Sequence, residues 1–263
     1  MNKPIGIFDS GVGGLTVAAE IMKKLPKENL IYLGDTARFP YGTKTAEQLI
    51  QYTFEIAEFL QEQDVKLVVI ACNSASAAAL EKAQEKFDIP IVGVVEPGAR
   101  AAVLASVSRH IGVIGTDATI KSEAYKKAIH LFDAGAKVFS GACPSFAAFV
   151  ENGYTKGEHI DEIAHKYLNP LKKQQIDSLI LGCTHYPLLS DVIQKVMGEN
   201  VQLISSAEET ALEVKEILKR KDQLREAEAP TYRFISTGDS SKFNKLGSRF
   251  LGHQIKVVET TKL

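Results

Sequence analysis

The chain alternates short apolar runs with longer stretches in which apolar residues recur every three or four positions. The short runs are rich in valine, isoleucine and leucine and predict β-strands, whereas the longer stretches predict amphipathic helices. This alternation favours an α/β fold with mainly parallel, buried strands. The predicted strands cover residues 4–8, 30–33, 66–71, 89–95, 111–115, 136–140, 178–181, 201–204, 232–236 and 254–258.

Two helix starts carry a capping signal. Thr45-x-x-Gln48 and Ser206-x-x-Glu209 both match the capping box, in which the side chains of the first and fourth residues bond each other's backbone N–H groups. The second box predicts a helix over 206–221. The first predicts a helix over 46–63, whose apolar face carries Leu49, Thr53, Ile56, Ala57 and Leu60.

A weak internal repeat indicates two related halves. Residues 5–10 resemble residues 111–116, an offset of 111 − 5 = 106. The run Leu67-Val-Val-Ile-Ala-Cys72-Asn-Ser resembles Ser178-Leu-Ile-Leu-Gly-Cys183-Thr-His, and its cysteines lie 183 − 72 = 111 positions apart. Gly42-Thr-Lys and Gly153-Tyr-Thr-Lys form a third pair. If the halves face one another, one thiol lies on each side of a cleft.

Composition narrows the class of protein. The 263 residues are 45% hydrophobic and 24% charged with a formal net charge of −1, so nothing indicates a nucleic-acid or membrane-surface partner. The chain reaches Asp9 before any apolar region of signal length, and no stretch approaches the roughly 18 apolar residues of a membrane span. We therefore expect a cytoplasmic protein. An odd number of cysteines, three, argues against a disulfide framework.

The glycine-rich segment Asp9-Ser10-Gly11-Val12-Gly13-Gly14 follows the first predicted strand and precedes a helix. It fails the dinucleotide fingerprint because Thr16 stands where that pattern needs glycine or alanine, and no phosphate-loop Gly-Lys-Ser/Thr follows. A tight turn with exposed backbone N–H groups remains, suited to a carboxylate or another anion. Asp9 ends its strand at the sheet edge where ligands bind in parallel sheets.

Each of the two repeated cysteines ends a strand and is followed by hydrogen-bonding side chains. Cys72 precedes Asn73 and Ser74 in the first turn of a helix, where free N–H groups stabilise an anion. Cys183 precedes Thr184 and His185, and a histidine so close to a thiol can exchange a proton with it. Two acid/base groups on opposite faces of one substrate are what inversion of a stereocentre requires. Cys143 lacks such neighbours, and we expect it to be structural.

Further candidates lie in predicted loops. Tyr41 and Gly42 follow the second strand and could supply hydroxyl and backbone donors, and Glu151 begins a loop-like break at the corresponding place in the second half. A zinc site is not expected, because the cysteines, histidine and aspartate show no local ligand spacing.

These motifs resemble a known family. Phe8–Leu15, Arg38–Gly42, Ala71–Ala75 and Gly182–Pro187 together are similar to the cofactor-independent aspartate/glutamate racemase superfamily, in the same order and spacing over nearly the whole chain. His185 stands where glutamate racemases carry histidine and aspartate racemases typically carry glutamate. Ser74 departs from the usual Cys-Asn-Thr but keeps the hydroxyl.

The resemblance implies two pseudo-twofold-related, three-layer α/β domains with mainly parallel sheets and an active site in the cleft between them. It also implies that the C-terminal segment returns to the first domain. We therefore expect residues 1–96 plus 208–263 to form the first domain and residues 97–207 the second.

The resemblance further implies that the enzyme interconverts L- and D-glutamate without cofactor or metal, as a homodimer, and supplies D-glutamate for peptidoglycan. One cysteine removes the Cα proton and the other returns a proton on the opposite face, Cys72 acting on the D enantiomer and Cys183 on the L enantiomer. Lowered thiol pKa values would fit this scheme. Asp9 assists Cys72, while His185 with Glu151 assists Cys183. The residues expected to bind substrate are Asp9, Ser10, Tyr41, Gly42, Asn73, Ser74, Thr184 and His185.

Three other interpretations stay open at this stage. The first is a racemase of the same superfamily that acts on aspartate or a hydantoin. The second is a nucleotide-binding or redox protein that uses the Gly11–Gly14 segment and the thiols. The third is a binding module that holds glutamate and leaves its Cα hydrogen in place.

Overall fold

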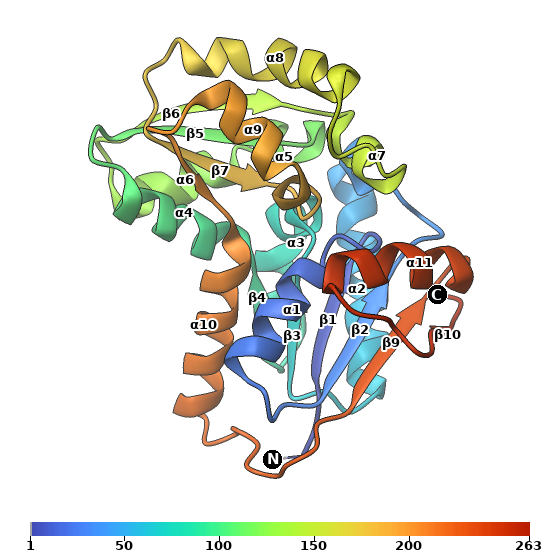
Figure 1. Ribbon diagram of the computed structural model, residues 1–263. Helices are drawn as coiled ribbons and strands as arrows, with labels where there is room; N and C mark the ends of the chain where they lie inside the picture. The colour runs from blue at the N-terminus through green and yellow to red at the C-terminus, as the bar shows by residue number, and fades with distance from the viewer. Residues whose placement is uncertain (1) are drawn as a thin grey trace.

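The computed structural model describes residues 2–263 and contains two parallel β-sheets, each flanked by helices (Figure 1). The first sheet has the order β10-β9-β2-β1-β3-β4 and the second the order β6-β5-β7-β8. The strands of the first sheet are β1 Ile5–Asp9, β2 Leu30–Gly34, β3 Leu67–Ile70, β4 Ile91–Gly93, β9 Tyr232–Ser236 and β10 Glu259–Thr260. Those of the second are β5 His110–Gly115, β6 Lys137–Ala142, β7 Ser178–Gly182 and β8 Gln202–Ile204.

Helices cover both faces of each sheet, as the apolar character of the central strands requires. On the first sheet, alternate residues of β1 and β3 pack with α1 and α10 on one face and with α2 and α3 on the other. The expected three-layer α/β fold is thereby confirmed. The helices are α1 Leu15–Lys24, α2 Ala46–Glu62, α3 Asn73–Lys86, α4 Val95–Ala105, α5 Asp117–Lys121, α6 Ala124–Phe132, α7 Phe146–Glu151, α8 Glu158–Lys172, α9 Ser190–Met197, α10 Ser206–Arg220 and α11 Ser240–Leu251, with short 3₁₀ turns η1 Tyr41–Thr43 and η2 Tyr186–Leu189.

The repeat in the sequence corresponds to a repeat in the structure. Four strands of the first sheet run β4-β3-β1-β2, and the second sheet runs β8-β7-β5-β6, so the strands that carry similar sequences occupy equivalent places. The register agrees as well, because Ile5 pairs with Leu67 in one sheet and Ile111 pairs with Ser178 in the other. The strands that precede the two cysteines, β3 and β7, are therefore equivalent.

The C-terminal segment adds its strands to the first sheet. β9 pairs with β2 along its whole length, Leu30 opposite Tyr232 and Gly34 opposite Ser236, and β10 pairs with β9. The first sheet thus draws strands from both ends of the chain, while α10 runs from the second sheet down beside the first (Figure 1). The division of the chain at residues 96 and 207 stays a prediction.

Two local expectations are wrong. Residues 254–258 form no strand, because the backbone of Ile255 is bound by side chains of α11: Ser248 Oγ accepts from its N–H at 3.0 Å, and Asn244 Nδ2 donates to its carbonyl at 2.8 Å. The 206 capping box is not formed, since Ser205 caps α10 and accepts from Ala207 N. The box at Thr45 and Gln48 is confirmed, as is the buried face expected for α2.

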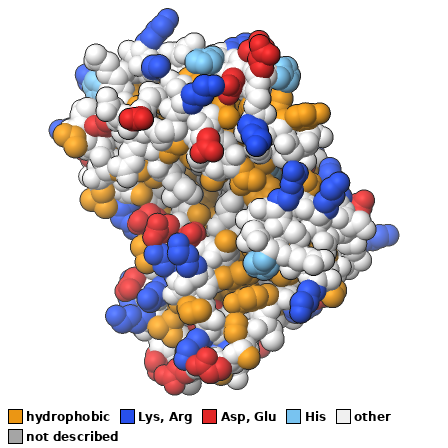
Figure 2. Space-filling view, in the orientation of Figure 1, with side chains coloured by type: hydrophobic (Ala, Val, Ile, Leu, Met, Phe, Trp, Pro, Cys, Tyr) orange, Lys and Arg blue, Asp and Glu red, His pale blue; other side chains and the backbone are white. Residues whose placement is uncertain are grey.

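The surface shows no segregation of charge on the face seen in Figure 2, where basic and acidic side chains are interspersed. Within residues 2–263, no helix combines the length and the apolar character needed to cross a membrane.

Candidate active site

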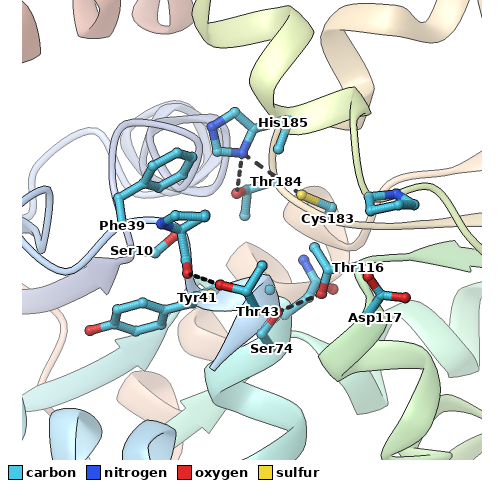
Figure 3. A pocket seen from close by; sticks show the side chains of 16 residues that line it. Ser10, Phe39, Tyr41, Thr43, Ser74, Thr116, Asp117, Cys183, Thr184 and His185 are labelled. Atoms are coloured by element: carbon cyan, nitrogen blue, oxygen red, sulfur yellow. Dashed lines mark hydrogen bonds between the residues drawn. The ribbon is translucent and has the colours of Figure 1, made fainter. Parts of the chain in front are cut away.

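One pocket receives residues from both halves of the chain (Figure 3). It lies at the carboxyl ends of strands β1, β3, β5 and β7, because the residues that follow these strands line it. The lining residues are Ser10, Phe39, Pro40, Tyr41, Gly42, Thr43, Cys72, Asn73, Ser74, Thr116, Asp117, Pro144, Ala147, Cys183, Thr184 and His185.

The two repeated cysteines meet at this pocket. Cys72 is the N-cap residue of α3, directly beyond β3, and Cys183 lies directly beyond β7. Their exposed fractions are only 6% and 7%, and no disulfide joins them to each other or to Cys143 among the described residues. Cys143 is fully buried and does not line the pocket, in keeping with a structural role.

Asp9 lies behind the pocket lining rather than in it. Its carboxylate accepts from the backbone N–H of Gly11 at 3.1 Å and from Thr184 Oγ1 at 3.4 Å, so it links the end of β1 to the end of β7. Burial raises the pKa of Asp9, an effect that the nearby His185 and the backbone N–H groups of Gly14 and Gly11 oppose.

Cys72 does not have the lowered thiol pKa that would fit the two-cysteine scheme. Burial raises the pKa of this thiol, and the neighbouring negative charge of Asp9 raises it further. The N–H of Ala75, at the start of α3, acts in the opposite direction without cancelling the shift. The surroundings of Cys72 therefore favour its neutral thiol form.

His185 lies between Cys183 and Glu151. Its Nδ1 is 3.7 Å from Cys183 Sγ, and its Nε2 is 3.3 Å from Glu151 Oε1 (Figure 3 shows the first contact). Burial alone would lower the pKa of the ring, but the contacts with Cys183 and Glu151 raise it to about 10. A protonated imidazole beside a thiol stabilises the thiolate form. The rings of Phe39 and Phe250 pack on it at 5.9 and 5.5 Å between centroids.

Glu151 lies in a helix and not in the loop expected from the sequence, and it contacts His185 as the resemblance implied. It is the last residue of α7, and its side chain is only 11% exposed. Besides His185, it faces Lys242 of α11 at 3.9 Å.

The glycine-rich segment allows a close approach between the two halves. A Cβ atom on Gly13 would lie 2.3 Å from Thr184 Oγ1 and 2.6 Å from His185 Nδ1. Gly13 therefore lets the loop after β1 lie directly against the histidine from the other half, which explains the glycine better than a nucleotide would.

Tyr41 contributes to the pocket differently from the sequence expectation. Its hydroxyl donates to the buried carboxylate of Asp35 and not to the pocket, and Figure 3 shows the phenol ring directed away from Cys183. Tyr41 therefore contributes its backbone, in η1, and the face of its ring to the pocket lining. Gly42 must lack a side chain, since a Cβ there would lie 2.7 Å from Thr116 Cβ.

Asn73 and Ser74 touch the second half across the cleft. Ser74 Oγ lies 2.9 Å from Thr116 Oγ1 (Figure 3). It also lies 3.2 Å from Thr119 Oγ1. Thr116 was not singled out from the sequence, although the internal repeat aligns it with Ser10 at an offset of 116 − 10 = 106. This alignment with Ser10 is the sequence signal that could have identified Thr116 as a lining residue.

Sequence reasoning also missed lining residues that carry no chemical motif of their own. They are Thr43, Asp117, Pro144 and Ala147, and Phe39 and Pro40 were read only as part of a loop. Among the lining residues that the structure describes there is no lysine or arginine. An anionic ligand would thus be held by neutral hydroxyl, amide and backbone donors, with His185 the one cationic group. Within residues 2–263 no cluster of side chains could hold a metal ion.

Comparison with known proteins decides the family. Residues 15–214 match the family model described as Asp/Glu/Hydantoin racemase. The chain belongs to this racemase family. The expected enzyme class, an isomerase of the amino-acid racemase type, is thereby confirmed, and the nucleotide-binding or redox interpretation is set aside.

Relatives within this racemase family are similar over nearly their full length. A glutamate racemase from Exiguobacterium sibiricum is 48% identical over 97% of this chain and 95% of its own. A crystal structure of a glutamate racemase isoform from Bacillus anthracis is 47% identical, with a TM-score of 0.94 over 99% of this chain and 97% of that one. A Francisella tularensis glutamate racemase in complex with D-glutamate is 37% identical, with a TM-score of 0.94 over 99% and 98% of the two chains.

Proposed function

We propose that this protein is a glutamate racemase that interconverts L- and D-glutamate by proton transfer between Cα and two cysteines. One observation carries the proposal: Cys72 and Cys183 follow equivalent strands of two equivalent sheets and line the same pocket. The relatives at 47–50% identity that are named glutamate racemases support the substrate, as does the related structure that holds D-glutamate.

In this mechanism one thiolate removes the Cα proton and the other cysteine, as a thiol, protonates the opposite face. Cys72 acts on the D enantiomer and Cys183 on the L enantiomer. The Cα proton is very weakly acidic, so the barrier to its removal must be lowered by the enzyme. The placement of the two sulfurs and preorganised hydrogen bonds to the substrate carboxylate supply this effect.

Residues next to each cysteine assist its proton transfer: His185 at Cys183 and Asp9 at Cys72. His185 is within 3.7 Å of Cys183 and is held by Glu151, so the ring is placed to exchange a proton with this cysteine. Asp9 assists Cys72, whose raised pKa matches the thiol form needed when L-glutamate is the substrate. In the other direction Asp9 accepts the proton on Cys72, which burial and a raised pKa of Asp9 make possible.

Substrate is held mainly by neutral donors. Ser10, Asn73, Ser74 and Thr184 line the pocket with hydroxyl and amide groups, and the backbone of Tyr41 and Gly42 supplies N–H groups. Asp9 and His185 add charge on either side. This arrangement suits a zwitterion with two carboxylates, because hydroxyl, amide and backbone N–H groups can donate to carboxylates and His185 is the one cationic group among the lining residues.

Racemisation in D₂O without added cofactor tests the mechanism. Each product molecule should carry deuterium at Cα, because the returning proton comes from a thiol in exchange with solvent. Replacing Cys72 or Cys183 by alanine should abolish turnover, whereas the matched variant Cys143→Ala should stay active. Product that retains the original hydrogen, or a fully active Cys72→Ala enzyme, would contradict the two-thiol scheme.

The competing substrates within the family are aspartate and hydantoins. Comparing the rates with L-glutamate, L-aspartate and a hydantoin decides among them, and we expect measurable turnover only with glutamate. A protein that binds glutamate but leaves its Cα hydrogen unexchanged would be a binding module.

We further propose that the enzyme acts as a cytoplasmic homodimer and supplies D-glutamate for bacterial peptidoglycan. Growth of a bacterial strain that requires external D-glutamate tests the cellular role: the gene should remove the requirement, and its Cys183→Ala version should not. Sedimentation of the purified protein should give the mass of two chains.

A further inference from the structure

A buried hydrogen bond joins the two halves just behind the pocket. The hydroxyl of Tyr125, on α6, donates to Oδ1 of Asn73, the first residue of α3, at 2.6 Å. Both side chains are almost fully buried, with exposed fractions of 2% and 3%. Asn73 lines the pocket, and Tyr125 does not.

The direction of this hydrogen bond follows from the groups that make it. The phenol O–H of Tyr125 is the donor, because Oδ1 of an asparagine amide can only accept. The phenol carries a single proton, and this bond uses it.

Close packing holds this hydrogen bond in place. Gly98 of α4 lies against Tyr125 and against Ser206 at the start of α10: a Cβ atom there would be 3.0 Å from Ser206 Cβ and 3.4 Å from the Tyr125 hydroxyl. Four helices, α3, α4, α6 and α10, thus meet around the phenol oxygen. The orientation of the tyrosine is determined by its surroundings and not by the pocket.

The bond determines which end of the Asn73 amide is available to a ligand. Oδ1 is occupied by Tyr125, and across residues 2–263 no protein acceptor is bonded to Nδ2. The amide of asparagine carries two donors on its nitrogen, and rotation about its last torsion is otherwise broad. With the oxygen held, the nitrogen is left to donate into a pocket whose lining contains no lysine or arginine.

We propose that Tyr125 is a positioning residue for the substrate: it fixes the Asn73 amide so that its N–H groups face a substrate carboxylate. The proposal rests on the proposed glutamate racemase function. Without the hydroxyl, the amide can turn its oxygen toward the carboxylate, which repels it.

Tyr125→Phe tests the proposal, since it removes one oxygen atom and little else. An interaction made equally in the ground and transition states changes KM and not kcat. We expect KM for glutamate to rise about tenfold, the size of one lost hydrogen bond, with kcat nearly unchanged. The matched control is Tyr167→Phe, which removes a hydroxyl 2.6 Å from Ser145 Oγ; neither of these residues lines the pocket, so KM should stay unchanged.

A double-mutant cycle separates positioning from packing. In an Asn73→Ala background there is no amide to orient, so Tyr125→Phe should have no further effect on KM. The same rise in KM in both backgrounds would overturn the proposal. So would a Tyr125→Phe enzyme that loses stability as Tyr167→Phe does but keeps its KM.

A measurement without turnover distinguishes failure of this proposal from failure of the proposed function. The side-chain amide protons of Asn73, followed by NMR in the protein labelled at asparagine, should give two distinct signals that exchange faster in Tyr125→Phe. If the wild-type protein does not racemise glutamate, the proposed function is wrong, and the NMR signals still decide the orientation of the amide. Identical signals in wild type and Tyr125→Phe would refute the role of Tyr125.

Discussion

At position 13 the absence of a side chain sets the distance between the two halves of the site. A Cβ atom on Gly13 would overlap Thr184 Oγ1 and His185 Nδ1, at 2.3 and 2.6 Å. Both of these groups are held from behind, His185 by Glu151 and Thr184 by Asp9, so neither can move aside freely. Glycine is required at position 13 because a side chain there would overlap the side chains of Thr184 and His185. Its backbone conformation does not require glycine.

We therefore expect Gly13→Ala to lower kcat/KM by roughly a hundredfold, the loss typical of a displacement of about 1 Å in an active site. Gly141→Ala is the matched control, because its Cβ would meet only the flexible end of Leu171, at 3.2 Å. Steady-state racemisation by both variants checks the expectation. Near-normal activity in Gly13→Ala would show that the loop can retreat.

The charge on His185 should govern the alkaline limit of activity. Its pKa in the folded protein is raised to about 10, in part by Glu151, so the ring stays protonated at neutral pH. The alkaline limb of kcat/KM should thus lie near pH 10 and should move toward 6.5, the ordinary value, in Glu151→Gln. A pH profile of both enzymes measures this, with the exposed Glu162→Gln as control.

The free energy of unfolding should also depend on the protonation of His185. A histidine whose pKa is raised on folding binds its proton more tightly in the folded state, so its contribution is complete below pH 6.5 and is lost as the pH rises through about 10. The difference in unfolding free energy between wild type and Glu151→Gln, measured by urea denaturation, should accordingly shrink across this window. A difference that stays constant with pH would contradict the assignment.

At the scale of single elements, the start of α2 is fixed by a reciprocal pair of hydrogen bonds. Thr45 Oγ1 accepts from Gln48 N at 3.3 Å, and Gln48 Oε1 accepts from Thr45 N at 3.1 Å. The helix then buries Leu49, Ile56 and Leu60 under the first sheet. Its start and its core contacts are set by different residues.

Thr45→Ala should therefore destabilise the protein by about 1 kcal/mol, the usual cost of losing an N-cap side chain. For a protein of this size the melting temperature should fall by about 2–4 °C. Gln48→Ala removes only the return bond and should cost less, and the double variant should fall short of the sum, since the two bonds form one unit. Thermal denaturation of the three variants measures this.

Elements were predictable where a local signal decides them and not where a distant contact does. The capping box at Thr45 is local and was confirmed. The strand at 254–258 was wrong because Asn244 and Ser248 of α11 bind the backbone of Ile255, a contact that no alternation of apolar residues reveals. The helix predicted over 206–221 is present as α10, but its cap is Ser205 and not Ser206.

The same division holds for the site. Cys72, Cys183 and their polar neighbours could be found from a repeat and a family resemblance, and they line one pocket. The direction of the Tyr41 hydroxyl could not be predicted from the sequence, since it depends on the buried carboxylate of Asp35. The role proposed for Tyr125 could not be predicted either, because this residue lies behind the pocket and belongs to no motif.

At the scale of the whole molecule, the first sheet is completed only by the last part of the chain. β9 covers the edge of β2, and Phe234, Phe243, Leu246 and Ile255 of the C-terminal segment belong to the core around α1 and α10. The C-terminal segment is thus an integral part of the first core.

Deletion of residues 229–263 should therefore leave β2 as an open edge and produce a protein that aggregates. Removal of Lys262 and Leu263 alone should leave the protein soluble and active. Soluble yield and near-UV circular dichroism distinguish the two deletions. A monodisperse, cooperatively folded 1–228 fragment would show that the first sheet is complete without β9.

The pairing of β9 with β2 also has a consequence for the order of events during synthesis. Between the end of β2 at Gly34 and the start of β9 at Tyr232 the ribosome must add 232 − 34 = 198 residues. At about 5–20 residues per second this takes roughly 10–40 s. Every strand of the second sheet, up to Ile204, is made within that interval, so the second sheet can assemble while the first still waits for its partner. The sheet that is begun first in translation is therefore the sheet whose strands are completed last.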